Sequence, residues 1–127
     1  MKIVVLKFGG TSVRSVLRIK KVASIIVSYL KKRFKVIVIS SAMSGVTNDL
    51  IKKSKDISNN FDKSEYDVLV STGEQMACAL IAGRLRHLGY KSQSWLSWQI
   101  PIVTEGPYGS SRISKINQNK IIKFLKS

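Results

Sequence analysis

Cysteine, carboxylates and long apolar runs are all scarce in this chain of 127 residues. The single cysteine, Cys78, excludes an internal disulfide framework, and its place in an apolar helical run predicts a buried thiol rather than a reactive one. No apolar run approaches the roughly 18 residues that a membrane-spanning helix needs, and the apolar stretch before Lys7 is too short for a signal peptide. We therefore expect a protein of the reducing cytoplasm, without a membrane partner, that forms one domain over residues 1–127.

The scarcity of carboxylates leaves a large positive charge, with 22 basic residues against 7 acidic ones and a net charge of +15. Such a charge attracts nucleic acids without specificity, so a basic nucleic-acid-binding module is one alternative. The lysines are dispersed, however, and the pairs at 20–21, 31–32 and 52–53 fall where helices should face solvent. Because the chain has no recognition motif and no aromatic stacking platform, we expect no specific nucleic-acid partner.

A strand, a helix and a second strand are predicted within residues 1–40. The apolar run at 2–7 (KIVVLK) is typical of a buried parallel strand, and 35–40 (KVIVIS) is a second, β-branched one. Between them, apolar residues at three- and four-residue steps predict a helix over about 12–33. This order is that of a right-handed βαβ unit with parallel strands.

The rest of the chain is predicted to be mainly helical. A first helix, capped by Thr47 or Asn48, is predicted to run to Ile57. A helical stretch from Lys63 is predicted to break near Thr72–Gly73, and a longer helix then runs to Leu88, where Gly89 caps it. A third strand is predicted over 91–96, a loop over 99–111 above Trp95 and Trp98, and a last helix over 116–125. The predicted fold class is α/β: a three-layer α/β/α open sheet, mostly parallel and Rossmann-like.

Residues 7–13 (KFGGTSV) form a turn between the first strand and the first helix. Gly9 and Gly10 allow backbone N–H groups to approach a ligand closely, Lys7 adds a full charge, and the following helix adds its positive N-terminal end. These features predict a phosphate site. The alternative is that the two glycines only turn the strand into the helix.

Two later segments, 41–48 (SAMSGVTN) and 71–75 (STGEQ), also contain small and polar residues. Loops that follow parallel strands meet at one edge of the sheet, so the segments after the first and second strands should converge there. Phosphoryl transfer depends mostly on positioning and charge neutralisation, and a carboxylate acceptor with a pKa of about 3.9 needs no general base. The alternatives are that Thr47 is only an N-cap and Glu74 only a carboxylate in a first helical turn.

These three segments, in this order and at this spacing, resemble the signatures of aspartate kinases in the amino acid kinase superfamily. The resemblance covers almost the whole chain but only the first part of a family member, so it implies a truncated N-terminal lobe of the amino acid kinase fold without a regulatory domain. The implied activity is ATP-dependent phosphorylation of L-aspartate to 4-phospho-L-aspartate, the first step towards lysine, threonine, methionine and diaminopimelate.

The resemblance also implies a role for individual residues. Lys7 would be the catalytic residue and, with Phe8, Gly9 and Gly10, would hold the transferred phosphate of ATP, which carries Mg²⁺ without metal ligands from the protein. The substrate side chains that the resemblance implies are Ser41 and Thr47, which would hydrogen-bond L-aspartate, and Glu74, which would accept its α-ammonium group.

The chain also departs from the pattern of the resembled family. Ser97 and Pro101 stand where that family has glycines, and proline fixes φ and removes an N–H, so the loop near the acceptor site should differ in shape. The later half of the family's kinase domain has no counterpart here. Two alternatives follow: a non-catalytic fragment, or half of a split kinase that a second polypeptide completes.

Overall fold

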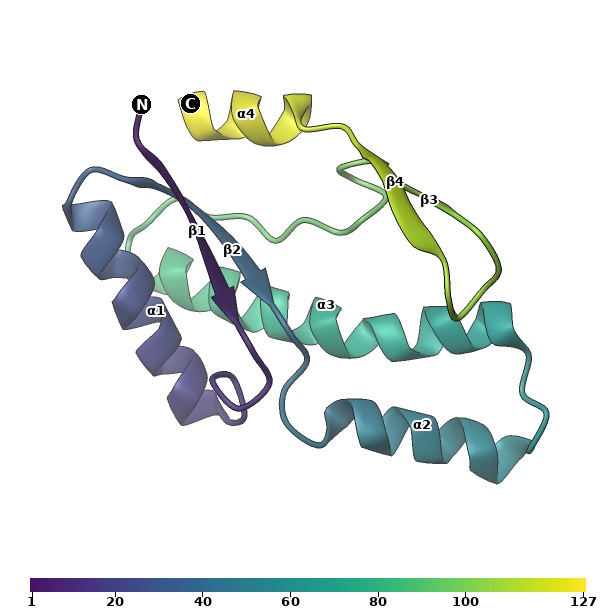
Figure 1. Ribbon diagram of the computed structural model, residues 1–127. Helices are drawn as coiled ribbons and strands as arrows, with labels where there is room; N and C mark the ends of the chain where they lie inside the picture. The colour runs from purple at the N-terminus through teal and green to yellow at the C-terminus, as the bar shows by residue number, and fades with distance from the viewer.

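The computed structural model describes residues 1–127 as four helices and four strands (Figure 1). In chain order the elements are β1 (Ile3–Phe8), α1 (Val16–Lys31), β2 (Lys35–Ser40), α2 (Val46–Ile57), α3 (Lys63–His87), β3 (Ile102–Glu105), β4 (Arg112–Ile116) and α4 (Asn119–Lys126). None of these helices is both long enough and apolar enough to cross a membrane.

β1 and β2 form the predicted parallel pair. Their register runs from Ile3 opposite Lys35 to Phe8 opposite Ser40. The ladder extends past the C-terminal end of both strands, because the Ser41 N–H donates to the Phe8 carbonyl oxygen at 3.0 Å. The predicted strand–helix–strand order is therefore confirmed, and both strand ends lie at the same edge.

Helices cover only one face of this strand pair. Leu6 and Phe8 of β1 pack on the central core, whereas Ile3 and Val5 on the opposite face are 44% and 59% exposed. The core lies between α1, α3 and the strands, and consists of Val13, Ile19, Val22, Ala23, Ile26, Ile81 and Leu85. The predicted α/β class is confirmed, but the second outer layer is not formed by these 127 residues.

The α1 helix begins later than the sequence predicts. Its N-cap is Ser15, whose side chain accepts a hydrogen bond from the Arg18 N–H at 3.3 Å. Ser12 does not start the helix, because the Ser12 and Val13 N–H groups both turn back to the Gly9 carbonyl oxygen. Six residues therefore separate Gly9 from Val16, and the helix end is not adjacent to the glycine pair as predicted.

The α3 helix is continuous through the predicted break at Thr72–Gly73. The Thr72 hydroxyl donates to the Leu69 carbonyl oxygen at 2.7 Å within the same helix, so threonine does not interrupt it. Gly73 is buried against the loop that follows β2, which explains a glycine here by close packing rather than by a break. The end of the helix is as predicted, because Gly89 has a φ of 83° and donates to the Arg86 carbonyl oxygen.

The predicted third strand over 91–96 is irregular in the structure. Side chains, rather than a strand ladder, attach this segment to α3: the Arg86 Nε donates to the Ser92 carbonyl oxygen, and the Ser92 hydroxyl donates to the Ala82 carbonyl oxygen. Trp95 packs edge-on against Phe124 of α4 at a ring distance of 5.8 Å, as a packed tryptophan should.

The predicted loop over 99–111 instead contains β3 and leads into β4, which pair as an antiparallel hairpin. Gly106 and Gly109 have φ values of 108° and 79°, which suits the connection between the two strands. Trp98 is 64% exposed, so its predicted packing under a loop is wrong. The final helix begins at Asn119 rather than at 116, because the residues before it belong to β4 and a short connection.

Candidate functional site

The three sequence segments converge on one buried residue, Ala42, just beyond the end of β2. A Cβ atom added to Gly10 would lie 3.2 Å from the Ala42 carbonyl oxygen, and one added to Gly73 would lie 2.9 Å from the Ala42 Cβ. The Ala42 N–H donates to the Glu74 Oε1 at 3.2 Å. The first and third segments therefore meet at Ala42 of the second, although 30 residues lie between Ala42 and Gly73 in the sequence.

Lys7 and Phe8 lie at the end of β1 but face opposite sides of the strand pair. The Lys7 side chain is on the uncovered, exposed face, and its amine lies within 4.0 Å of no carboxylate, since the one ion pair in the structure joins Lys53 and Asp49. The Phe8 side chain packs on the core. The Phe8 side chain is therefore not free to serve a ligand at this edge, and its carbonyl oxygen already accepts the Ser41 N–H, whereas the Lys7 amine is available.

Free backbone donors follow Lys7 directly. The N–H groups of Gly9, Gly10 and Thr11 donate no hydrogen bond within the chain. The glycine pair keeps side chains away from these donors, and nothing lies within 4 Å of a Cβ built on Gly9. Several N–H groups beside one ammonium group fit an anion such as phosphate.

The start of α2 supplies a second group of free donors. Gly45, with a φ of 84°, is the N-cap residue, so Thr47 lies in the first turn and the predicted capping by Thr47 or Asn48 is wrong. No side chain caps this helix, and the Thr47 and Asn48 N–H groups have no partner in the chain. The hydroxyls of Thr47 and of Ser41, both half-buried, also make no hydrogen bond within the chain and can bind a polar ligand.

Glu74 lies in the middle of α3 rather than at a helix start, so the predicted stabilisation by a helix dipole is wrong. One of its carboxylate oxygens holds the Ala42 N–H, and the other has no partner in the chain. Burial raises the pKa of the half-buried Cys78 thiol one turn later, and the Glu74 carboxylate adds to this. The expected unreactive thiol agrees with this direction.

Sequence reasoning did not identify Ala42 and Gly73 as parts of the site. Both are small residues next to predicted polar ones, and their role is to let α3 approach the loop after β2 closely. The only signal in the sequence was that Ala42 stands next to Ser41 and Gly73 next to Glu74. This signal does not reveal which segment of the chain each small residue contacts.

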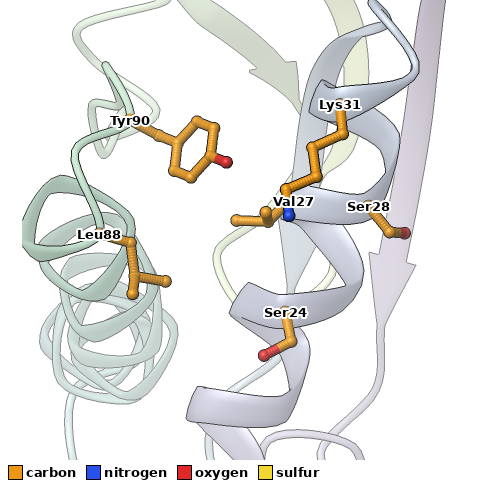
Figure 2. A pocket seen from close by; sticks show the side chains of 6 residues that line it. All are labelled: Ser24, Val27, Ser28, Lys31, Leu88 and Tyr90. Atoms are coloured by element: carbon orange, nitrogen blue, oxygen red, sulfur yellow. The ribbon is translucent and has the colours of Figure 1, made fainter.

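Two hollows of the surface lie away from these segments. One, of about 450 Å³, lies between α1 and the end of α3, where Leu88 and Tyr90 face Val27 (Figure 2). The hydroxyls of Ser24 and Ser28 beside it are bonded to the backbone of their own helix. The other, of about 750 Å³, follows β2. Neither contains a predicted site residue.

Comparison with known proteins gives consistent relatives. The chain is 44% identical to an aspartokinase of Geobacillus stearothermophilus and 41% identical to one of Rickettsia felis, each over 98% of this chain. It spans only 31% and 32% of those two proteins, or about a third of their length.

Solved structures show the same likeness. An aspartate kinase from Synechocystis superposes on 69% of this chain with a TM-score of 0.66 and 40% identity, and the match covers 15% of that protein. Escherichia coli aspartokinase III, solved in complex with aspartate and ADP, superposes on 90% of this chain with a TM-score of 0.71. That match covers 35% of the second protein and, at 21% identity, supports the fold alone.

The sequence model of the amino acid kinase family matches residues 2–127, which is all of the chain except its first residue. The predicted resemblance to aspartate kinases is therefore confirmed, and the fold is that of part of an amino acid kinase domain. On this match, the chain belongs to the amino acid kinase family.

Proposed function

We propose that this chain carries the aspartate- and phosphate-holding part of an aspartokinase, which uses ATP to convert L-aspartate into 4-phospho-L-aspartate. The observation that carries the proposal is the convergence of the three segments on Ala42, which joins the free donors after β1 to the carboxylate of Glu74. The aspartokinase relatives at 41% and 44% identity favour this member of the family.

The phosphate side of the site consists of Lys7 and the N–H groups that follow it. Phosphoryl transfer moves negative charge from the attacking carboxylate oxygen across the phosphoryl group to the leaving oxygen, so fixed positive groups around the phosphoryl group lower its barrier. The Lys7 amine and the N–H groups of Gly9 and Gly10 would hold the transferred phosphate. Mg²⁺ would arrive with ATP and neutralise further charge on its phosphates.

The aspartate side consists of Ser41, Thr47 and Glu74. The two free hydroxyls can donate to substrate carboxylates, and the free oxygen of Glu74 can accept the α-ammonium group. The aspartate side chain, with a pKa of about 3.9, is already ionised at neutral pH, so it can attack without a general base. The product would then supply lysine, threonine, methionine and diaminopimelate synthesis.

The chain spans about a third of its aspartokinase relatives, so the test supplies the remaining residues as a separate polypeptide. The alternative is a non-catalytic fragment. The test mixes the chain with a polypeptide that comprises the rest of the Geobacillus stearothermophilus aspartokinase and traps the acyl phosphate with hydroxylamine. ATP-dependent aspartyl hydroxamate in the mixture supports the proposal, and none in the mixture or with the chain alone contradicts it.

Two matched pairs of variants assign the roles. Lys7→Ala should lower kcat about 10²- to 10³-fold, as loss of one electrostatic donor does, whereas Lys52→Ala, which removes an exposed lysine of α2, should not. Glu74→Gln should raise the KM for aspartate about tenfold or more, because the acceptor of the α-ammonium group loses its negative charge. Glu65→Gln on the exposed first turn of α3 is its control. Equal effects within either pair would refute the assigned role.

A further inference from the structure

The hollow between α1 and the end of α3 lies far from the candidate site. Its volume is about 450 Å³, which is within the range of small-molecule sites, and it is lined by Ser24, Val27, Ser28, Lys31, Leu88 and Tyr90. Lys31 ends α1, whereas the glycine pair precedes the start of this helix at Val16, about 22 Å away at 1.5 Å per residue. A ligand of this hollow therefore occupies a place separate from the strand ends.

Apolar side chains from both helices face each other across the hollow. Val27 of α1 lies opposite Leu88 and the ring of Tyr90 (Figure 2). Val27 and Tyr90 are half-buried and Leu88 is 38% exposed, so part of this apolar surface remains open to a ligand. Tyr90 is fixed in place because its N–H donates to the Leu85 carbonyl oxygen at 3.0 Å, directly after the Gly89 cap. The hollow therefore offers an apolar surface on which the body of a small molecule can pack.

Two unpaired donors adjoin this apolar surface. Figure 2 shows the Tyr90 hydroxyl pointing towards α1, and the Lys31 side chain running back along α1 towards Val27. Neither group has a hydrogen-bond or ion-pair partner in the chain. The hydroxyls of Ser24 and Ser28 already donate to backbone carbonyl oxygens of α1, so they are not free donors. One ammonium group and one phenol hydroxyl match the two oxygens of a carboxylate.

Both segments that build the hollow lack carboxylates, because residues 1–48 and 75–104 contain no aspartate or glutamate. Along α3, Glu74 precedes Leu88 by about 21 Å at 1.5 Å per residue. Arg84 is one turn before Leu88 on the same side of α3, and its buried Nε has no hydrogen-bond partner. A buried donor of a charged group is costly without an acceptor. The charge at this end of α3 therefore favours an anionic ligand and opposes a cationic one.

We propose that this hollow binds a small organic carboxylate with an apolar body. The carboxylate accepts hydrogen bonds from the Lys31 amine and the Tyr90 hydroxyl, and the apolar body packs on Val27 and Leu88. A phosphate group fits less well, because two donors do not satisfy its three oxygens. This binding is independent of the proposed kinase chemistry, since it needs neither ATP nor aspartate.

The test titrates the full chain with four probes in about 0.15 M salt and follows them by NMR. Benzoate carries the charge and the ring, benzamide only the ring, acetate only the charge, and benzamidine the ring with the opposite charge. Benzoate should bind saturably, shift the signals of Val27, Leu88 and Tyr90, and bind at least about tenfold more tightly than the other three, because it alone satisfies both features. No saturable binding of benzoate, equal binding of benzamide or acetate, or shifts confined to other residues would refute the proposal.

Variants of the two donors separate recognition from general charge attraction. Lys31→Met keeps the apolar stem and should weaken benzoate binding about tenfold or more, and Tyr90→Phe should weaken it about threefold or more. Lys32→Met removes the same charge from the next, exposed residue, which does not line the hollow, and should leave binding unchanged. Equal losses from Lys31→Met and Lys32→Met would overturn the proposal, because benzoate would then respond only to net charge.

A charge-reversed variant excludes misfolding as the cause of lost binding. Lys31→Glu should transfer the preference from benzoate to benzamidine, because the group beside Val27 changes sign. A misfolded chain would bind neither probe through this hollow, so the gain of benzamidine binding identifies a folded site. Failure of the preference to reverse would contradict the assignment of Lys31 to the carboxylate.

Discussion

Residues 1–90 and 91–127 differ in what holds them in place. The first region contains the whole central core, whereas in the second only Leu125 is buried. The β3–β4 hairpin is almost entirely exposed and is attached to α3 by the Gly109 N–H, which donates to Asp67 at 2.9 Å. Burial therefore determines the structure of the first region, and a few polar contacts and the Trp95–Phe124 pair determine that of the second.

The largest expected difference between the regions comes from truncating one isoleucine in each. Ile26→Ala in α1 removes a side chain that is 1% exposed in the central core, so it should lower the free energy of unfolding by about 2–5 kcal/mol. Ile113→Ala in β4 removes one that is 63% exposed, and the change should stay within about 0.5 kcal/mol. Urea denaturation followed by circular dichroism measures both.

Equal losses from the two variants would contradict the comparison, because they would show that the hairpin contributes as much buried surface as the core. A loss confined to the near-ultraviolet signal of the tryptophans after Ile113→Ala would instead locate the effect in the second region. Trp95 and Trp98 both lie in that region, so the signal reports on it directly.

The same difference explains what the sequence could predict. The strand over 35–40 was predicted with its observed bounds, because a β-branched run between a helix and a turn favours a strand. The segment over 91–96 was wrongly predicted as a strand, since Trp95 packs on Phe124 of α4 and the Ser92 hydroxyl bonds to the backbone of α3, rather than to a neighbouring strand. Within the second region, local pattern and final structure disagree where no core decides between them.

For the site, the sequence predicted the residues but not their arrangement. Lys7 and the glycine pair are recognisable because a charged residue beside two glycines after a strand suits an anion. The convergence on Ala42 depends on Gly73 in α3, and no local pattern shows which loop a helical glycine approaches. Glu74 was placed at a helix start for the same reason, since Gly73 favoured a break.

Substitutions of two glycines of α3 test this packing, and their expected effects on stability are smaller than that of Ile26→Ala. Gly73→Ala places a Cβ 2.9 Å from that of Ala42 and 3.2 Å from a Val46 methyl group, so it should destabilise the protein by about 1–3 kcal/mol. Gly83→Ala meets nothing within 4 Å and should stabilise it by about 0.5–1 kcal/mol, the usual gain of alanine over glycine in a helix. The midpoints of urea denaturation give the two signs.

Stability changes of opposite sign would confirm that Gly73 is required for close packing and that Gly83 is not. If both substitutions stabilised the chain, the loop after β2 would be free to move away from α3, and the proposed site would lack its fixed centre. Loss of the Ala42 N–H protection from exchange in Gly73→Ala alone would show that the bond to Glu74 depends on the same close approach.

The smallest expected effect concerns the N-terminus of α3, which lies within the first region but anchors the hairpin of the second through Asp67. Asp62 caps this helix by accepting hydrogen bonds from the Ser64 hydroxyl and N–H and from the Glu65 N–H. The bond from the Ser64 hydroxyl, followed by that from the Glu65 N–H, lowers the pKa of Asp62 below its ordinary value of 3.8.

A lowered pKa means that the folded state stabilises the ionised carboxylate of Asp62 more than the unfolded state does. Its contribution is therefore complete above a pH of about 3.8 and is lost as the pH falls through the lower folded value. Exchange at the Ser64 and Glu65 N–H groups, corrected for the intrinsic rate, should rise in that range. Exchange at the Arg18 N–H should not, because the α1 cap, Ser15, does not titrate.

Asp62→Asn keeps a capping oxygen but removes the titration, so it should abolish the difference between the two helices below pH 3.8 while leaving α3 capped at neutral pH. If Arg18 and Ser64 lost protection together in the wild-type chain, acid would be unfolding the core as a whole, and the two regions would form one cooperative unit. If only the first turn of α3 and the hairpin N–H of Gly109 opened, the second region would be released first, because the hairpin is held by the N-terminal part of α3.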